Sequence, residues 1–304
     1  NLLKKTFIIK NMFNKIIDDI SKVIIGNKEK IKLTLATIIS EGSILIEDFP
    51  GSGKTTFAKS ITNNLGFNFK RIQFTSDLLP SDILGFNIFS KDKLSFQKGP
   101  IFTNIVLADE LNRGSPKSQS AFLEAMEEKN VSIDGTTYKL PEPFFVIATQ
   151  NPMDASGTSS LPDSQLDRFM ISFSLSDLQD NEKIKMLKNN ISFNENNSNP
   201  LNWDNLKNKR MRINVNDEIY QYIIEIEQTI KSLEQEIYIS ARCLKQIIDL
   251  AKGWAMISDK EYVTHQDIKE IIPYILRHRI KFLNQDEKFD FIKKEILEKI
   301  IIKK

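Results

Sequence analysis

The sequence predicts an α/β domain built on a parallel sheet, followed by a small all-α domain. Three observations lead to this prediction. A short apolar run, residues 43–47, leads into a glycine-bearing loop that ends in Gly53–Thr55. Strand-like and helix-like segments then alternate to about residue 176, the order expected of a doubly wound parallel sheet. From Asp217 onward, apolar residues recur only at helical spacing.

Length and composition limit the class of protein. The chain has 304 residues, enough for two domains of roughly 100–200 residues each. Its 42 basic and 40 acidic side chains give a net charge of +2, so no strong positive field surrounds it, and nucleic acid is not an expected partner. Cys243 is the single cysteine, which we expect to be a small buried apolar residue in a reducing compartment.

Membrane and export signals are not found in the sequence pattern. No apolar run reaches about 18 residues. The opening residues 1–6 lack the apolar segment of a signal peptide. The sequence therefore predicts a cytoplasmic protein with no membrane insertion.

The first part of the chain is predicted to hold two helices before its first strand. Residues 10–23 and 28–40 each place apolar side chains at helical spacing. After the strand and the glycine-bearing loop, a helix is expected to end at Gly66. Alternating side chains then predict a second strand over residues 67–74.

Two β-hairpins are predicted outside this alternation. The first pairs residues 87–89 with residues 94–96 around Ser90–Lys93. The second spans residues 131–140, where Asp134-Gly135 lies between two strand-like runs. Asp-Gly favours a two-residue turn, because both turn positions need a positive φ angle.

Two buried strands are predicted to end in polar residues. Residues 105–108 are apolar and lead directly into Asp109-Glu110, and residues 144–148 lead into Thr149–Asn151. Between them, Ser115-Pro116 is a start signal for a helix that runs to about Glu128. Side chains at the carboxyl ends of such strands lie where open α/β sheets bind ligands.

The composition changes in the second half of the chain. Asn189–Asn208 is rich in Asn and Ser, which predicts a loop or linker. Thr264 and Asp267 cap a later helix, which Pro273 is expected to kink or restart. The expected boundaries are 1–176 for the α/β core, 177–209 for the linker and 210–304 for the helical domain.

The loop after the first strand is predicted to hold a nucleoside triphosphate with Mg²⁺. Backbone N–H groups of Gly51–Thr55 can surround the β-phosphate, Lys54 can reach the β- and γ-oxygens, and the Thr55 hydroxyl can bind Mg²⁺. Asp48 stands where such loops open with glycine, so either a left-handed Asp48 or a Pro50-Gly51 bend must turn the chain. A chance Gly-Lys-Thr in an ordinary strand-turn-helix is the alternative. The candidate cofactor-binding residues here are Pro50, Gly51, Ser52, Gly53, Lys54, Thr55 and Thr56.

Asp109 and Glu110 supply the carboxylates that hydrolysis needs beyond the phosphate cradle. Asp109 can hold Mg²⁺ through water, and Glu110 can polarise an attacking water. Asn151, at the end of the next strand, is placed to orient that water. The alternatives are two solvated acids at a strand end and a turn asparagine before Pro152.

Taken together, these motifs resemble the MoxR family of AAA+ ATPases, and the resemblance spans nearly the whole chain. It implies an AAA+ nucleotide-binding core with a parallel sheet and a small all-α lid domain. Residues 154–160 depart from the family pattern, which bears on local loop contacts rather than on chemistry. The motifs that carry the resemblance are Gly51–Thr55, Leu107–Gly114, Phe145–Pro152 and Leu161–Phe169, extended by Arg71–Asp82, Gln119–Glu127 and Leu276–Arg279.

The resemblance implies roles for further residues. Arg168 would be the arginine finger that reaches the γ-phosphate bound by a neighbouring subunit, and Arg242 would be the sensor arginine of the lid. A guanidinium suits both roles because it stays charged and meets phosphate oxygens with a planar fork. Without the family, both arginines would be read as surface salt-bridge formers. Ile25-Gly26 would pack on the adenine base.

The resemblance bears on three further assignments. Gln73 lies near a switch position against Glu110, and Arg113 is implied at a subunit interface. Arg277–Arg279 fits either a solvated basic face or a functional interface.

The resemblance implies ATP hydrolysis with Mg²⁺ in a homo-oligomeric, hexameric ring. It also implies that the two hairpins, which it matches at about residues 86–98 and 131–140, face the pore. Chaperone-like remodelling of a client protein would follow, with a von Willebrand factor A domain protein as a possible partner. Two alternatives stay open at this point. One is the ATPase subunit of a metal chelatase or a nucleic-acid motor, and the other is a non-hydrolysing, nucleotide-gated binding module.

Overall fold

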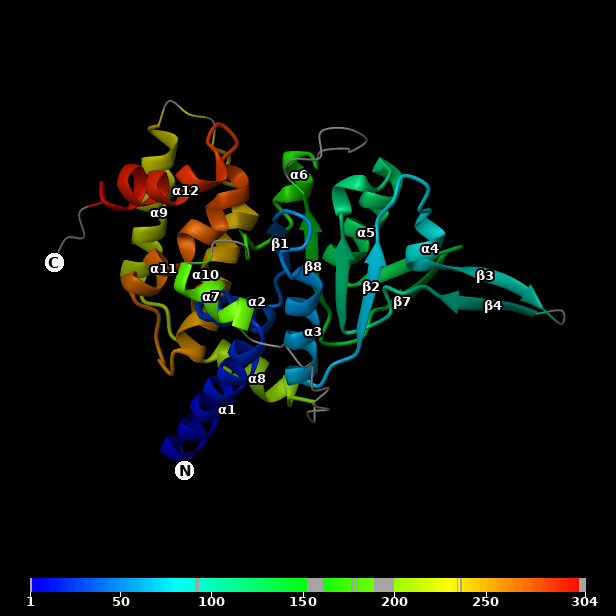
Figure 1. The fold of residues 1–304 in the computed structure, drawn as a ribbon, viewed down its shortest axis with the longest axis horizontal. Helices are drawn as coiled ribbons and strands as arrows, with labels where there is room; N and C mark the ends of the chain where they lie inside the picture. Colours follow the sequence, from blue (N-terminus) through cyan, green and yellow to red (C-terminus); the bar gives the residue numbers. More distant parts are fainter. Residues whose placement is uncertain are drawn as a thin grey trace.

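The structure combines a parallel sheet with a group of helices on one side and a projecting hairpin on the other (Figure 1). The helices of residues 217–297 lie to the left of the sheet in this view, and the hairpin of residues 85–98 extends to the right. It is a computed structural model, which describes residues 2–90, 93–151, 161–175, 178, 180–188, 200–233, 235 and 237–300.

The central sheet confirms the predicted parallel α/β core. In sheet order, its strands are β2 (Phe69–Gln73), β5 (Ile105–Asp109), β8 (Phe145–Gln150), β1 (Ile44–Glu47) and β9 (Ile171–Phe173). All neighbouring strands pair in parallel. The carboxyl ends of β1, β5 and β8 therefore meet at one edge, and the three polar segments predicted from the sequence follow these strand ends.

Side chains on the two faces of the sheet belong to two separate cores. Ile44 and Ile46 point into the larger core, which joins the sheet to the N-terminal helices and to the helical domain. Leu45 and Val106 point into the smaller core with Phe122 of α5 (Pro116–Glu128). Full burial of both faces explains why these strands are continuous apolar runs in the sequence.

The helices next to the sheet begin and end where the sequence predicts. α3 (Lys54–Leu65) ends at Gly66, whose φ angle is 71°. The Ser115 hydroxyl accepts a hydrogen bond from the Ser118 N–H at the start of α5, at 3.3 Å. The short elements α4 (Pro80–Leu84), η1 (Leu111–Arg113) and α6 (Asp163–Leu166) complete this part of the fold.

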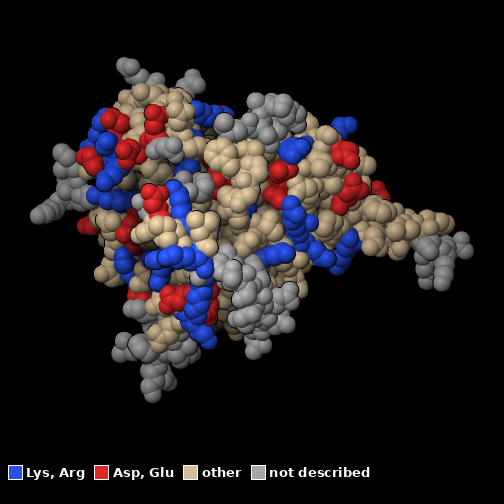
Figure 2. All heavy atoms as spheres, in the orientation of Figure 1, with Lys and Arg blue, Asp and Glu red and all other residues tan. Residues whose placement is uncertain are grey.

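The two predicted hairpins are present and contact each other. β3 (Gly85–Ser90) pairs with β4 (Lys93–Lys98), and β6 (Asn130–Ile133) pairs with β7 (Thr136–Lys139). Phe96 stacks on Tyr138 with ring centroids 4.1 Å apart. At the tip of β3–β4, Phe89 and Leu94 are paired across the strands and are 71% and 63% exposed. Figure 2 shows this arm as mostly uncharged up to its undescribed tip.

The N-terminal helices α1 (Leu2–Val23) and α2 (Lys28–Ile39) pack against the helical domain as well as the sheet. α2 lies so close to α10 (Ala241–Ile257) that a Cβ atom added at Gly253 would lie 2.4 Å from Ser40 Oγ. The same position would lie 2.6 Å from the Ala36 carbonyl oxygen. Helices α1 and α2, which we assigned to the core by sequence order, thus connect the core to the lid.

The helical domain follows the predicted periodicity with one correction. Its elements are α9 (Asp217–Lys231), α10, α11 (His265–Leu276), η2 (Arg277–Arg279), α12 (Gln285–Phe291) and the π-helical turn η3 (Ile292–Leu297). Thr264 and Asp267 form the predicted capping box of α11. The helix is not restarted at Pro273 but continues to Leu276. Burial of Ile271 and Ile275 on both sides of the proline compensates for the one backbone hydrogen bond that it removes.

The segment predicted as a linker contains two helices in its described parts. These are α7 (Asp180–Lys188) and α8 (Trp203–Met211). Asn202 caps α8, since its side-chain oxygen accepts a hydrogen bond from the Asn205 N–H at 3.0 Å. Leu206 anchors the helix in the larger core. Asn-rich composition suggested a loop, but asparagine is also a preferred N-cap residue.

None of the helices in the described ranges has the length and apolar character that crossing a membrane requires.

Candidate functional site

The phosphate loop leaves β1 and opens into free space. Gly51 and Gly53 have φ angles of 84° and 85°, a region that side-chain-bearing residues rarely adopt. An added Cβ at either glycine would meet no atom within 4 Å. α3 begins directly at Lys54, so its first N–H groups and its positive end face the same space. Pro50 and Ser52 belong to the loop, Thr55 and Thr56 to the first turn of α3, and each is at least partly exposed.

The loop entry is turned by Gly51 rather than by Asp48, which corrects one of our two predicted possibilities. Asp48 has no positive φ angle, and its side chain is buried. One carboxylate oxygen accepts from the Phe49 N–H at 2.9 Å and the other from the Leu175 N–H at 2.8 Å. Asp48 therefore ties the loop to the end of β9.

Lys54 lies over the loop itself. Its ammonium group donates to the carbonyl oxygens of Asp48, at 3.1 Å, and Phe49, at 2.6 Å. These partners hold the charge beside the open space in front of Gly51 and Gly53. A phosphate oxygen arriving there would meet a cation already in position.

Asp109 ends β5 and makes contacts that the sequence did not predict. Arg71, on the neighbouring strand β2, donates to Asp109 Oδ2 through Nε at 2.9 Å and Nη2 at 2.6 Å. The other carboxylate oxygen accepts from the Thr149 hydroxyl at 2.6 Å. The Asp109 carboxylate is thus fixed between β2 and β8, with a half-exposed guanidinium on one side.

Glu110 is held in an uncommon backbone conformation beside Asp109. Its φ angle is 53°, and its N–H donates to the Thr149 hydroxyl at 2.9 Å. Oε2 accepts from Gln73 Nε2 at 2.8 Å and forms an ion pair with Arg113 at 3.1 Å. The structure therefore places Gln73 against Glu110, as expected from the resemblance. It also places Arg113 on Glu110 of the same chain.

Asn151 follows β8 at the same sheet edge. Its carbonyl oxygen accepts from Asn112 Nδ2 at 3.4 Å, which ties it to the 3₁₀ turn after Glu110. Pro152 and residues 154–160, where the sequence departs from the family pattern, lie outside the described residues.

The turn between α1 and α2 carries the predicted base-packing residues. Gly26 has a φ angle of 76°. A Cβ added there would lie 2.6 Å from Leu178 Cδ2 and 2.7 Å from Glu182 Cδ. Leu178 and the start of α7 therefore pack directly against this turn. The Ile25 carbonyl oxygen accepts from Asn27 Nδ2 at 3.0 Å.

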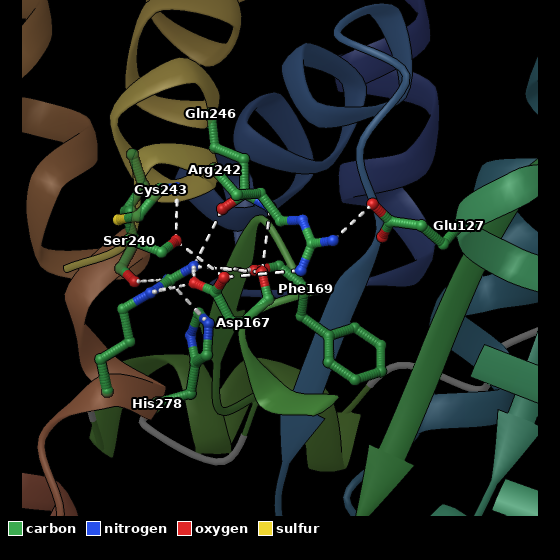
Figure 3. Close-up of polar contacts among 10 residues, drawn as sticks. Glu127, Asp167, Phe169, Ser240, Arg242, Cys243, Gln246 and His278 are labelled. Carbon is green, nitrogen blue, oxygen red and sulfur yellow. Dashed lines mark hydrogen bonds and ion pairs between the residues drawn. The ribbon is translucent and has the colours of Figure 1, made fainter. Parts of the chain in front are cut away.

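Arg242 belongs to a cluster of polar side chains around Asp167 (Figure 3). Arg242 pairs with Asp167 Oδ2 at 3.5 Å and with Glu127 of α5 at 2.8 Å. Arg168 is the next residue in the chain and is partly buried, and its Nε has no hydrogen-bond partner among the described residues. The sensor candidate is thus part of a cluster formed by α5, the end of α6 and the start of α10, and the finger candidate directly follows the central Asp167 in the chain.

Arg277–Arg279 are buried, which contradicts the solvated basic face that we considered. They lie in η2, and the whole residues are 4%, 3% and 8% exposed. Arg279 pairs with Asp167 at 3.1 Å, whereas Arg277 Nε donates to Gln285 of α12 at 3.0 Å. Burial and the neighbouring Arg279 charge hold the pKa of His278 well below its ordinary value of 6.5.

Cys243 is the small buried residue that the sequence predicted. It is fully buried and free, and burial raises the pKa of its thiol to about 11. It is therefore inert at neutral pH.

Sequence reasoning missed Arg71, Thr149, Asp167 and Arg279 as members of these clusters. The place of Arg71 could have been predicted, because it lies two residues from Gln73 and so on the same side of β2. The contact between Asp167 and Arg279 could not, since they are 112 residues apart in the chain.

The residues at the sheet edge fit a nucleoside triphosphate and Mg²⁺. The open glycine loop and the start of α3 supply backbone donors, and Lys54 supplies a cation. The Thr55 hydroxyl and the Asp109 carboxylate offer the oxygen ligands that Mg²⁺ prefers. Among the described residues, His, Cys, Asp and Glu form no separate metal cluster.

Comparisons with known proteins agree with this geometry. A model of the ATPase family associated with various cellular activities (AAA) matches residues 43–171, and a model of the AAA lid domain matches residues 227–300. The fold and these matches define an AAA-type ATPase with a lid.

Relatives that match nearly the full length of the chain identify its family more closely. The chain is 38% identical to the uncharacterized protein YeaC of Bacillus subtilis, over 96% of this chain and 93% of that one. It is 32% identical to Chaperone MoxR1 of Mycobacterium tuberculosis, over 92% of this chain and 78% of that one. A crystal structure of a candidate ATPase from Cytophaga hutchinsonii superimposes with a TM-score of 0.86 at 34% identity, covering 100% of this chain and 98% of that one. The chain belongs to the MoxR family of AAA+ ATPases.

Proposed function

We propose that this ATPase hydrolyses ATP at sites shared between neighbouring copies in a hexameric ring, and that hydrolysis drives chaperone-like remodelling of a partner protein. The observation that carries the proposal is the convergence of Lys54, Asp109 and Glu110 at one sheet edge, around the open glycine loop. MgATP, when bound there, supplies the anhydride bond that is broken and the charge that neutralises the phosphates.

Residues of one chain would bind the nucleotide and activate water. Lys54 and the loop amides bind phosphate oxygens, and Thr55 and Asp109 hold the metal. Glu110 acts as the general base, and Asn151 orients the water beside it. Thr149 supports this arrangement, because its hydroxyl joins the Asp109 carboxylate to the Glu110 backbone.

Arg168 and Arg242 would complete the site of the neighbouring copy. Two cations suit a triphosphate that carries several negative charges. Arg242 pairs with Asp167 at 3.5 Å, and Arg168 directly follows Asp167 in the chain, which supports a common target for both arginines, namely the nucleotide of the next subunit. Ile25 and Gly26 would pack on the adenine base of the chain's own nucleotide.

The β3–β4 hairpin would contact the client. Its tip exposes the Phe89–Leu94 pair, and Phe86 and Ile88 are 47% and 38% exposed farther down the arm. Exposed apolar groups on a projecting element suit the transient binding of unfolded or partly folded segments. A partner with a von Willebrand factor A domain would deliver such clients.

Phosphate release measured across protein concentration tests the shared site. We expect activity per subunit to rise as interfaces form and to be insensitive to single-stranded DNA. The Glu110→Gln variant, run in parallel, controls for contaminating ATPases. Turnover that is independent of concentration in a protein that stays monomeric would contradict the shared site, and strong stimulation by DNA would favour a nucleic-acid motor.

A further inference from the structure

Arg279 has the least exposed side chain among the ion-paired residues of the cluster around Asp167, and the proposed function gives it no role. It lies in η2, between α11 and α12 of the lid, with a side chain that is 4% exposed. Its guanidinium Nη2 lies 3.1 Å from Asp167 Oδ1 and 2.9 Å from Gln246 Oε1. The lid thus places a buried cation directly on the core domain.

The contacts of Arg279 lie on both sides of the finger candidate. Nη2 is 3.5 Å from the backbone oxygen of Asp167 and 3.4 Å from that of Phe169, the residues immediately before and after Arg168. A rigid guanidinium can bridge several acceptors of a turn in this way, whereas an ammonium on a flexible chain cannot. Arg279 therefore fixes the backbone from which Arg168 projects.

Asp167 connects the same pair to Arg242. While Oδ1 accepts from Arg279, Oδ2 accepts from the Ser240 hydroxyl at 2.7 Å and faces Arg242 at 3.5 Å. Ser240 also caps α10, the helix that carries Arg242, by accepting from the Cys243 N–H at 2.9 Å. One buried carboxylate thus fixes the start of the sensor helix and the finger turn together.

We propose that Arg279 is a positioning residue for ATP hydrolysis, which holds Arg168 and Arg242 in register for the nucleotide of the neighbouring subunit. The inference rests on the proposed function, since it assigns both arginines to that site. It also gives the Leu276–Arg279 motif a role, because the η2 turn of the lid would determine the position of Arg168. Movement of the lid would then alter the site of the next subunit.

The Arg279→Lys variant tests this proposal, because it keeps the charge and removes the planar fork. We expect kcat to fall by about 10²-fold, the usual cost of a misplacement near 1 Å, with KM for ATP changed by less than about twofold. Arg277→Lys is the matched control, because Arg277 lies in the same turn but bonds to Gln285. Unchanged kcat in Arg279→Lys, or an equal loss in Arg277→Lys, would overturn the proposal.

Mixing variants separates positioning from general damage. Arg279→Lys keeps an intact phosphate loop, and Lys54→Ala keeps an intact finger, so their mixture should regain activity as a mixture of Arg168→Ala with Lys54→Ala does. A mixture of Arg279→Lys with Arg168→Ala should stay low, because neither partner supplies a positioned finger. If Arg168→Ala is rescued by Lys54→Ala and Arg279→Lys is not, Arg279 is a structural residue.

Hydrogen exchange tests the same inference without catalysis or assembly. The N–H groups of Asp167, Arg168 and Phe169 donate within their own turn, at 2.9, 3.2 and 3.0 Å. We expect these amides to exchange faster in Arg279→Lys and at an unchanged rate in Arg277→Lys. Unaltered exchange at all three would refute the proposal even if the shared site is correct. A failed rescue of Arg168→Ala would refute the shared site, and faster exchange in Arg279→Lys would then show only that Arg279 fixes the turn. If Arg279→Lys does not fold, the double variant Asp167→Asn with Arg279→Gln replaces it in the kinetic, mixing and exchange experiments. This double variant removes both buried charges.

Discussion

The sheet edge at Asp109 and the cluster at Asp167 both join a carboxylate to arginines, but they differ in burial. Arg71 is 48% exposed on Asp109, whereas Arg279 is 4% exposed on Asp167. A half-exposed guanidinium can leave its partner for water at little cost, and a buried one cannot. The first carboxylate can therefore exchange a cation, as a metal ligand must, and the second can only hold a geometry.

The two regions also differ in how the chain assembles them. The sheet edge uses segments that follow parallel strands, so each segment is a contiguous motif. The Asp167 cluster draws on α5, α6, α10 and η2 (Figure 3). Groups that bind phosphate need contiguous backbone amides, whereas groups that position other side chains can come from any part of the fold.

The largest expected effect is on catalysis at the sheet edge. Glu110→Gln should lose turnover by about 10²–10⁴-fold, the usual contribution of a positioned general base. Nucleotide binding should persist, because Lys54, Thr55 and Asp109 remain. Phosphate release and nucleotide-dependent thermal stabilisation measure the two effects. Turnover within twofold of the parent would show that Glu110 has another role.

A stability comparison of the two carboxylates should give the next largest effect. Asp167→Asn leaves the Arg279 charge buried without its partner and should lower the free energy of unfolding by about 3–5 kcal/mol. Asp109→Asn leaves Arg71 free to reach water and should lower it by less than about 1 kcal/mol. Urea unfolding of both variants measures the difference. Equal losses would remove the distinction between the two regions.

The pH dependence of stability should show that the Asp167 cluster is buried. The pKa of His278 is lowered in the folded protein, so below pH 6.5 the unfolded chain binds a proton that the folded chain does not. Stability should therefore fall as pH drops from 6.5, by up to about 1.4 kcal/mol per pH unit. His278→Gln should reduce that slope. His265→Gln is the matched control, since these are the two histidines of the chain. An unchanged slope in His278→Gln would show that His278 is accessible to protons.

The smallest expected effect concerns Arg71. Its guanidinium would compete with a bound metal for Asp109 Oδ2, and a half-exposed pair is worth up to about 1 kcal/mol. Arg71→Ala should therefore lower the Mg²⁺ concentration for half-maximal turnover by up to about fivefold. A titration of activity with Mg²⁺ measures this shift. An increased requirement would mean that Arg71 helps to orient Asp109 for the metal.

The sequence predicted most of the sheet edge and little of the Asp167 cluster. The phosphate loop, Asp109-Glu110 and the Asp134-Gly135 turn were predictable, because each depends on neighbours in the chain. The contact of Arg71 with Asp109 depends on the pairing of β2 with β5, which sequence spacing does not encode. Helix α8 was missed because Asn202 was read as part of a loop, whereas it is an N-cap.

The shared catalytic site is the central claim, and a mixture of two inactive variants tests it most directly. Lys54→Ala lacks the phosphate cradle, and Arg168→Ala lacks the finger, which should cost on the order of 10³–10⁵ in rate. In a mixed assembly, an intact cradle meets an intact finger from its neighbour, so phosphate release should return to a measurable fraction of the parent rate. Mixtures that exchange subunits, yet stay as inactive as either variant, would contradict the account.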